Sequence, residues 1–333
     1  MNQPYDALLI VSFGGPERMA DVTPFLENVL RRRNVSAERM RAVANHYEMF
    51  GGVSPINEQN RNLIAALQEE LAVNGPSIPI YWGNRNWHPL LADTVWQMAA
   101  DGIKKALAFV TSAYSSYSSC RQYLENIAEA RDQVGSSAPQ IIKLRAFYNH
   151  PLFIEANVDC LQAALSTIPE ARRASTQIAF TAHSISQSMA DNCQYESQLR
   201  ETSRLISLAA NRDSWRLVYQ SRSGLPTQPW LGPDILDYLK ELKRSTDVVI
   251  APIGFVSDHM EVIYDLDTEA RQFCDEVGLN MARASTAGTH PLFIRMIREL
   301  VLERINPGAG RRFLGAQGAS HDVCPTGCCL PKG

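Results

Sequence analysis

The sequence has little net charge and no long apolar run. Its 32 Lys and Arg residues nearly balance 35 Asp and Glu residues, which gives a formal net charge of −3 over 333 residues. The densest basic cluster is the arginine triple at 31–33, too short to indicate a nucleic-acid-binding surface. No stretch reaches the roughly 18 consecutive apolar residues of a membrane-spanning helix. These absences argue against nucleic-acid-binding and membrane-spanning proteins.

A secretory signal and a disulfide framework are also missing. The first residues, MNQPYDALLIVSFGG, have no basic segment, and their apolar run is too short for a signal sequence. Four of the seven cysteines are widely scattered, and the total is odd. This usage is unlike that of a secreted, disulfide-stabilised protein. We therefore expect a cytoplasmic protein, and a chain of this length buries enough core to be stable as a monomer.

The glycine fingerprint of dinucleotide-binding proteins is absent. SFGGPE, residues 12–17, has two glycines after an apolar run but does not match G-x-G-x-x-G. The acidic residue expected about 20 positions further on is not convincingly placed either. A nucleotide-using enzyme is therefore a weak alternative for this chain.

What the sequence does contain is a regular alternation of short apolar runs and amphipathic segments. We predict strands at 7–13, 78–83, 106–112 and 141–147, and again at 176–182, 215–220, 247–255 and 279–285. Helical patterns between them include 60–72 and 150–165. This alternation predicts an α/β fold with two Rossmann-like domains, each a four-stranded parallel sheet flanked by helices, and a cleft between them.

The domain boundaries follow from this division. We predict an N-terminal domain at 1–155 and a second domain at 156–287. A last amphipathic helix at 288–306 is expected to pack back on the first domain. Residues 307–333 are rich in Gly and small polar residues without periodicity, so this tail should be disordered unless something ties it down.

Ligands of such sheets bind beyond the carboxyl ends of the strands, where this chain concentrates reactive side chains. His183 directly follows the fifth predicted strand, and Glu261, Asp265 and Glu269 follow the seventh at a spacing that puts them on one helix face. A structural histidine and an exposed acidic face are the ordinary alternatives. If the histidine and the carboxylates face one cleft, these side chains could instead bind a divalent metal and accept protons.

Three cysteines crowd the tail in CPTGCC, at 324, 328 and 329. Three thiols in six residues indicate an iron–sulfur cluster, a zinc site or a redox pair. A [2Fe–2S] cluster needs one more cysteine from the body of the chain, whereas zinc could use His321 instead. Incidental cysteines in an exposed tail are the remaining alternative.

Several of these segments together resemble the ferrochelatases. The matching segments run in order from about residue 5 to residue 306 and include SFGGPE, FGGVSPIN, TSAYSSYSSCRQY, AFTAHSIS, QPWLGP and PIGFVSDHMEVIYDLDTEA. The body most resembles the actinobacterial type that makes coproheme, and the tail resembles that of cluster-bearing bacterial members. The resemblance implies an enzyme of haem biosynthesis that inserts Fe²⁺ into a porphyrin. The substrate would be coproporphyrin III, with protoporphyrin IX, or a non-enzymatic tetrapyrrole or metal carrier, as the alternatives.

The resemblance also implies roles for individual residues. His183 and Glu261 match the catalytic pair, which would also contact the substrate iron. Asp265 and Glu269 match an acidic row proposed as a metal or proton path. Phe13 stands where some members have a tyrosine near the metal, and His46 where an arginine is common. The implied porphyrin contacts are Phe13, Arg31 or Arg32, Ser54, Tyr123 and Trp230.

For the [2Fe–2S] cluster, the resemblance implies four cysteine ligands. The tail would supply Cys324, Cys328 and Cys329, and Cys160 would be the internal ligand. Cys193 is the alternative internal ligand.

Overall fold

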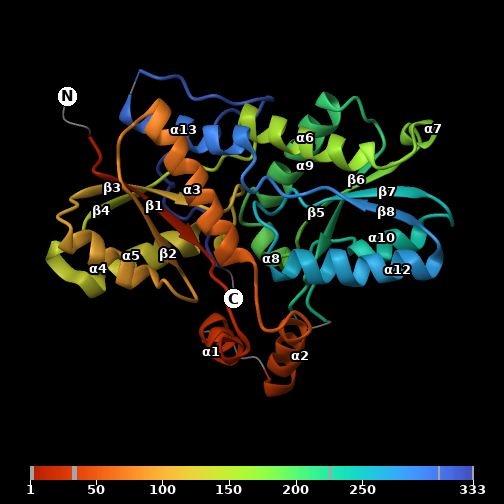
Figure 1. The fold of residues 1–333 in the computed structure, drawn as a ribbon, viewed down its shortest axis with the longest axis horizontal. Helices are drawn as coiled ribbons and strands as arrows, with labels where there is room; N and C mark the ends of the chain where they lie inside the picture. The colour runs from red at the N-terminus through yellow and green to blue at the C-terminus, as the bar shows by residue number, and fades with distance from the viewer. Residues whose placement is uncertain (1–3, 32–35, 225–226, 307, 332–333) are drawn as a thin grey trace. The chain divides into compact units, whose positions relative to one another are not determined.

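A computed structural model describes residues 4–31, 36–224, 227–306 and 308–331 of the chain. It has two four-stranded sheets, in the orders β2-β1-β3-β4 and β6-β5-β7-β8, and the paired strands in both run parallel. Helices flank each sheet (Figure 1). The predicted fold class is therefore confirmed. The chain forms two compact units: the first lies within 1–111, 122–144 and 297–309, and the second within 112–121, 145–296 and 310–333.

The sheet of the first unit is built around β1 (Ala7–Ser12), whose six residues are all buried. It pairs with β2 (Ile80–Asn84) on one side and β3 (Lys105–Val110) on the other, and β4 (Gln140–Lys143) extends the sheet beyond β3. In this register Leu8 lies opposite both Ile80 and Leu107. A strand that is buried along its whole length is typical of a parallel sheet with both faces covered.

Helices cover both faces of this sheet. In Figure 1, α3 lies on one face and α4 and α5 lie on the other. The Ile297–Ile305 part of α13 also belongs to the first unit, and Arg298 attaches it to the end of α3 by donating to the carbonyl oxygens of Asn74 and Gly75 at 2.6 and 2.7 Å. The helices that contribute to this unit are α1 (Met19–Leu30), α2 (Ala37–Glu48), α3 (Ile56–Asn74), α4 (Leu91–Ala100), α5 (Gln122–Val134), the short 3₁₀ helix η2 (Gly135–Ser137) and α13 (Pro291–Ile305).

The second unit repeats the same plan. Its strands are β5 (Gln177–His183), β6 (Trp215–Gln220), β7 (Asp247–Ala251) and β8 (Asn280–Arg283), with β5 and β7 in the centre of the sheet. Figure 1 shows α6 and α9 on one face of this sheet and α10 and α12 on the other. Its α-helices are α6 (Pro151–Ser166), α7 (Glu170–Arg173), α8 (Gln187–Ala190), α9 (Tyr195–Ala209), α10 (Ile235–Glu241), α11 (Met260–Val262) and α12 (Arg271–Val277), and two π-helical segments are η1 (Tyr117–Arg121) and η3 (Ile263–Ala270).

All eight predicted strands are present, but several end earlier than predicted. The strand predicted at 247–255 stops at Ala251, because Pro252 has no N–H to donate to the ladder. The amide of Ile253 instead donates to the carbonyl of Ala251 and forms a turn. Apolar residues after a strand end extend the hydrophobic pattern without extending the pairing, so the pattern alone overestimates the length of the strand.

The tail is attached to the second unit rather than loose. The buried amide of Asn149 donates to the carbonyl oxygens of Leu314 and Gly318 at 3.1 and 2.8 Å, and the Leu314 amide donates back to the Asn149 carbonyl at 2.9 Å. Arg145 donates to the Arg312 carbonyl at 2.9 Å. These contacts provide the tie that the sequence analysis required for an ordered tail. Among the described residues, no helix has the length and apolar character to cross a membrane.

Candidate active site

His183 is the last residue of β5, directly after a run of fully buried strand residues. Its Nδ1 makes a short contact with the carbonyl oxygen of Ser184. A carbonyl oxygen only accepts hydrogen bonds, so Nδ1 carries the hydrogen and Nε2 has the free lone pair in the neutral ring. The Tyr195 hydroxyl donates to the backbone carbonyl of His183 at 3.0 Å. The Ser184 contact therefore leaves Nε2 as the ring nitrogen available for chemistry.

Glu261 faces that nitrogen. Its Oε1 lies 3.5 Å from Nε2 of His183, and its side chain is 46% exposed. Glu261 lies in α11, which His259 caps by accepting the Glu261 amide on its own Nδ1 at 3.1 Å. Gln220, at the end of β6, donates to the Glu261 carbonyl at 2.9 Å. The end of β5, the end of β6 and the segment after β7 therefore meet around Glu261.

The electrostatic surroundings of the two imidazoles differ. Burial would lower the pKa of His183, but Glu261, the Ser184 carbonyl and Asp265 together outweigh burial and raise it. Burial lowers the pKa of His259 and is only partly opposed by Glu261. The surroundings therefore favour a proton on His183 and keep His259 neutral.

Asp265 is an electrostatic neighbour of both His183 and Glu261. It accepts a short hydrogen bond from the Ser221 hydroxyl and a longer one, 3.4 Å, from Gln220. Burial, with the neighbouring charges of Glu261 and Glu269, raises the pKa of Asp265 to about 7, although the Ser221 hydrogen bond lowers it. The pKa of Glu269 is raised as well, by burial and by Asp234. The acidic row therefore consists of carboxyl groups that influence one another and that hold protons more readily than free carboxyl groups.

The segment that carries this row is not an ordinary α-helix. Asp265 and Glu269 lie in the π-helical segment η3, which follows α11 without a break. Its hydrogen bonds run to the fifth residue along instead of the fourth, a geometry that is rare and frequent at functional sites. The inner face is anchored by Val262, Leu266 and Ala270, all fully buried in the core of the second unit.

Trp230 belongs to a loop that pairs with the segment after β5. An isolated antiparallel bridge joins Trp230 to Ser186, and the Leu231 amide donates to the Ile185 carbonyl at 3.0 Å. The indole packs on Gly224, where a Cβ atom would lie 2.2 Å from Nε1 of the ring. Trp230 is therefore held beside Ser186, three residues after His183.

In the first unit the structure brings together two of the predicted porphyrin contacts. The Arg85 guanidinium lies 5.7 Å from the centre of the Phe13 ring and 4.5 Å from that of Tyr123. Phe13 also packs against Phe25 with the ring centres 6.2 Å apart. Arg85 was not predicted as a site residue, and its place just after β2 is the one signal of it in the sequence.

The structure also places the other residues of the first unit that the resemblance singled out. Ser54 is buried, and its amide donates to the Pro16 carbonyl at 2.8 Å. Arg31 is exposed at the end of α1, whereas Arg32 lies outside the described residues. His46 is half-buried on α2, and burial, with a smaller effect of Arg39, lowers its pKa.

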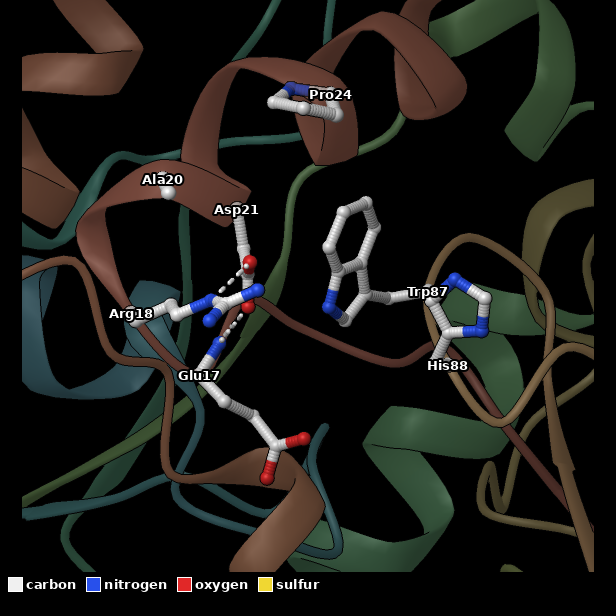
Figure 2. A pocket seen from close by; sticks show the side chains of 7 residues that line it. All are labelled: Glu17, Arg18, Ala20, Asp21, Pro24, Trp87 and His88. Atoms are coloured by element: carbon white, nitrogen blue, oxygen red, sulfur yellow. Dashed lines mark hydrogen bonds and ion pairs between the residues drawn. The ribbon is translucent and has the colours of Figure 1, made fainter.

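A surface pocket of about 570 Å³ lies beside α1 in the same unit (Figure 2). Asp21 accepts hydrogen bonds from the Arg18 side chain at 2.9 Å and from the Glu17 amide at 3.2 Å, and the Trp87 indole stands across from them. Of the predicted site residues that the structure describes, none lines this pocket. Its lining consists of Glu17, Arg18, Ala20, Asp21, Pro24, Trp87 and His88.

The tail gathers a set of soft metal ligands. Donor atoms of His321, Cys324 and Cys328 all lie within 4.8 Å of one another, and the Cys328 and Cys329 sulfur atoms are 3.5 Å apart. Burial raises the pKa of the Cys329 thiol, and Cys328, Cys120 and Cys193 raise it further. The thiols of Cys120 and Cys193 are therefore close to the tail cysteines.

Cys160 lies in different surroundings. It is buried in α6, and its thiol is 3.8 Å from the carbonyl oxygen of Thr286. Burial raises its pKa, and its charged neighbours are Asp159 and Asp258. Cys193, by contrast, has Cys328 of the tail among the neighbours that raise the pKa of its thiol.

Two parallel sheets with reactive groups at the carboxyl ends of their strands define a chelatase-type fold. SirB from Bacillus subtilis with Fe³⁺ matches with a TM-score of 0.56 and 12% identity, over 92% of this chain and 98% of that chain. The sirohydrochlorin chelatase SirB from Bacillus subtilis subspecies spizizenii, in complex with cobalt, gives a TM-score of 0.53 at 11% identity over 91% and 96%. At these identities the likeness concerns the fold alone.

Sequence comparison is more specific. The ferrochelatase family model matches residues 5–305. A ferrochelatase of Rhodopirellula baltica is 59% identical over 330 residues, 98% of this chain and 94% of the relative. A coproporphyrin III ferrochelatase of Streptomyces coelicolor is 49% identical over 350 aligned positions, 98% and 93% of the two chains. The chain belongs to the ferrochelatase family, the enzymes that insert iron into porphyrins, and the resemblance in its motifs is confirmed.

Proposed function

We propose that this ferrochelatase inserts Fe²⁺ into coproporphyrin III, and that His183 and Glu261 carry the reaction. The substrate is supported by relatives named coproporphyrin III ferrochelatase in Streptomyces coelicolor and Nocardia farcinica, both 49% identical to this chain. The catalytic pair is supported by one observation above all, the 3.5 Å approach of Glu261 to Nε2 of His183. A cytoplasmic location and a monomeric state stay predictions.

Metal insertion releases two protons from the pyrrole nitrogens, so the enzyme needs a base on one face of the macrocycle. In this proposal His183 is that base, because Ser184 occupies Nδ1 and leaves Nε2 to accept a proton. Glu261 stabilises the imidazolium that forms, consistent with the raised pKa of His183. Binding the macrocycle bent, which exposes its nitrogen lone pairs, would favour the transition state over the flat substrate.

The acidic row has a different task. Fe²⁺ arrives with bound water, and carboxylate oxygens can replace that water. We propose that Asp265 and Glu269 guide the metal toward Glu261 or carry protons away. The pKa of about 7 for Asp265 supports this, because the group can both take up and release a proton near neutral pH.

The porphyrin contacts extend this proposal to the periphery of the macrocycle. Coproporphyrin III carries four propionates where protoporphyrin IX carries two, so its binding requires more cationic and hydroxyl side chains. Arg31, Ser54 and Tyr123 are the proposed partners of these carboxylates. Phe13 and Trp230 are the proposed apolar contacts.

We propose in addition that the tail holds a [2Fe–2S] cluster. The donor set fits this cofactor, because the tail thiols of Cys324, Cys328 and Cys329 lie near one another and near the body of the second unit. The surroundings favour Cys193 over Cys160 as the internal ligand. When bound, the cluster supplies a covalent link between the tail and the body, and no step of metal insertion depends on it. Zinc held with His321 is the second candidate, favoured by the 3.9 Å approach of its Nε2 to Cys328.

The substrate is tested by following absorption bands during anaerobic incubation with Fe²⁺ and each porphyrin. We expect kcat/KM for coproporphyrin III to exceed that for protoporphyrin IX by roughly tenfold or more. The reverse preference would contradict the proposed substrate. Tight porphyrin binding with no metal insertion above the protein-free control would indicate a carrier instead.

The cluster is tested by the colour and composition of protein purified without oxygen. We expect reddish-brown protein with equal amounts of iron and sulfide, and a colourless Cys193→Ser variant. Cys160→Ser is the matched control and should stay coloured. Colourless parent protein that contains zinc would contradict the cluster and support the His321 site.

A further inference from the structure

Arg283, the last residue of β8, holds two carboxylates at once. Its Nη1 lies 3.0 Å from Oδ1 of Asp258, and its Nε lies 2.5 Å from Oδ1 of Asp267. Its side chain is only 17% exposed, so these carboxylates take the place of water around the guanidinium. Burial would lower the pKa of Arg283, but Asp267 and Asp258 more than offset it, so the group stays charged.

The two partners of Arg283 bracket the segment that carries the proposed chemistry. Asp258 lies three residues before Glu261, just ahead of α11, and Asp267 follows Asp265 within η3. His259, Glu261 and Asp265 all lie between the two anchored carboxylates. One guanidinium therefore links both ends of residues 258–267, hereafter the catalytic segment.

Besides Arg283, the segment is anchored in its middle by hydrogen bonds from Gln220 to the Glu261 carbonyl and from Ser221 to Asp265. Its inner face is held by apolar contacts of Val262 and Leu266, which favour burial but not one particular rotation or slide of the helix. A guanidinium has donors in a fixed plane, so two carboxylates bound to it are fixed relative to each other. Without it, two partly buried carboxylates would be left without this partner, and the segment would move to solvate them.

We propose that Arg283 is a positioning residue for metal insertion, which holds Asp258 and Asp267 so that Glu261 and Asp265 keep their places relative to His183. The inference rests on the proposed roles of His183 and Glu261, and it assigns Arg283 no contact with metal or porphyrin. A displacement of about 1 Å in a reacting group can cost roughly 10²-fold in rate, so a link of this kind has a large effect on turnover.

Arg271 provides a matched control. It lies at the start of α12, directly after η3, and its Nη1 donates to the Met281 carbonyl of β8 at 2.5 Å. It therefore also ties this region to β8 and is partly buried, but its partner is a backbone carbonyl, and it lies outside the catalytic segment. Loss of Arg271 should affect stability without moving Glu261.

The experiment compares Arg283→Gln, Arg283→Lys and Arg271→Gln for kcat, for the dissociation constant of coproporphyrin III by fluorescence quenching, and for Tm. We expect Arg283→Gln to lower kcat by about 10²-fold and Arg283→Lys to lie between it and the parent, both with porphyrin affinity within about twofold of the parent. Arg271→Gln should keep kcat within about twofold even where Tm falls. A double Asp258→Asn, Asp267→Asn variant should lose most of the same activity, and adding Arg283→Gln to it should cost little more.

Two results would overturn the proposal. One is a folded Arg283→Gln variant with parental kcat, and the other is an equal fall of kcat in the Arg283→Gln and Arg271→Gln variants. If Arg283→Gln does not fold, Arg283→Lys decides: reduced kcat at unchanged porphyrin affinity supports the positioning role, and parental kcat overturns it. Glu261→Gln in the same series distinguishes failure of the Arg283 proposal from failure of the proposed function. Parental activity in Glu261→Gln would contradict the catalytic role of His183 and Glu261 itself.

Discussion

Glu261 comes within 3.5 Å of His183 although the two residues belong to α11 and β5. The approach depends on β5 and β7 being neighbours in a parallel sheet, since the chain after each strand then emerges at the same edge. The imidazole presents Nε2 because the Ser184 carbonyl holds Nδ1. A base and a carboxylate are thus paired at the end of the strand in a protein whose family inserts iron into porphyrins.

Replacing Glu261 should change the ionisation of His183 as well as the rate. Glu261 raises the pKa of His183, so in Glu261→Gln we expect that pKa to fall and the imidazole to be neutral over more of the pH range. Nuclear magnetic resonance titration of the histidine ring nitrogens measures this directly. The rate of metal insertion should fall by about 10²-fold or more. A His183 pKa that is unchanged in the variant would contradict the electrostatic pairing.

Asp265→Asn should make the protein more stable and less active. The pKa of Asp265 is raised to about 7 in the fold, so the folded state holds a proton that the unfolded state releases above its ordinary value of 3.8. Stability therefore falls as pH rises through this interval, by up to about 4 kcal/mol in the linkage limit. The Asp265→Asn variant has no carboxyl group to titrate here, so its unfolding free energy does not fall in this way. In urea unfolding, the free energy of unfolding of Asp265→Asn should exceed that of the parent at pH 8, and by less at pH 5.

The activity of the same variant tests the proposed path. If ionised Asp265 takes part in metal or proton transfer, the parental rate should fall as the pH drops through about 7, and Asp265→Asn should lose that step together with much of its rate. A variant with a parental pH profile would mean that Asp265 is structural. Ser221→Ala is a useful companion, because loss of its hydrogen bond should raise the pKa of Asp265 further.

His150 should limit stability in acid. It is buried at the start of α6, where its Nδ1 accepts the Leu152 amide at 3.2 Å, and burial, with Arg145 and Arg312, lowers its pKa to about 3. Between pH 6.5 and 3 the unfolded state binds a proton that the folded state does not, so stability is lost as the pH falls through this interval. His150→Asn keeps a capping acceptor but removes the titration. We expect its unfolding free energy to depend less on pH over this range than that of the parent, and an equal dependence would refute the assignment.

Asn149 should control whether the tail is held. Its amide bonds the Leu314 and Gly318 carbonyls, and each buried hydrogen bond lost costs about 1–3 kcal/mol. In Asn149→Ala we expect protease to cleave the tail faster, while metal insertion continues. Asn157→Ala is the control, since its buried amide bonds Phe153 within α6 and does not touch the tail. Equal tail cleavage in both variants would show that general destabilisation, and not the tail contact, is responsible.

The sheets and the approach of the segment after β7 to His183 could be predicted because both follow from general rules. Alternating apolar runs reveal parallel strands, and strand ends in such sheets converge, so His183 and the residues after β7 were expected together. The resemblance in motifs then identified the family. The ends of the strands were less predictable, because apolar residues after Ala251 continue the pattern without continuing the ladder.

Other features could not be predicted because they depend on contacts between distant residues. The π-helix of residues 263–270 has the same spacing of acidic residues as an α-helix and no compositional mark of its own. Nothing in the sequence pairs Arg283 with Asp258 and Asp267. The proximity of Cys193 to the tail, and the hydrogen bonds from Asn149 to the tail, likewise appear only when the chain is folded.

The most direct test of the account is the anaerobic rate of Fe²⁺ insertion into coproporphyrin III by His183→Ala beside the parent enzyme. The alanine variant should still bind the porphyrin, yet its rate should fall by about 10²- to 10⁴-fold, the range that a positioned base contributes. A folded His183→Ala protein that inserts iron at the parental rate would contradict the assignment of His183 as the base.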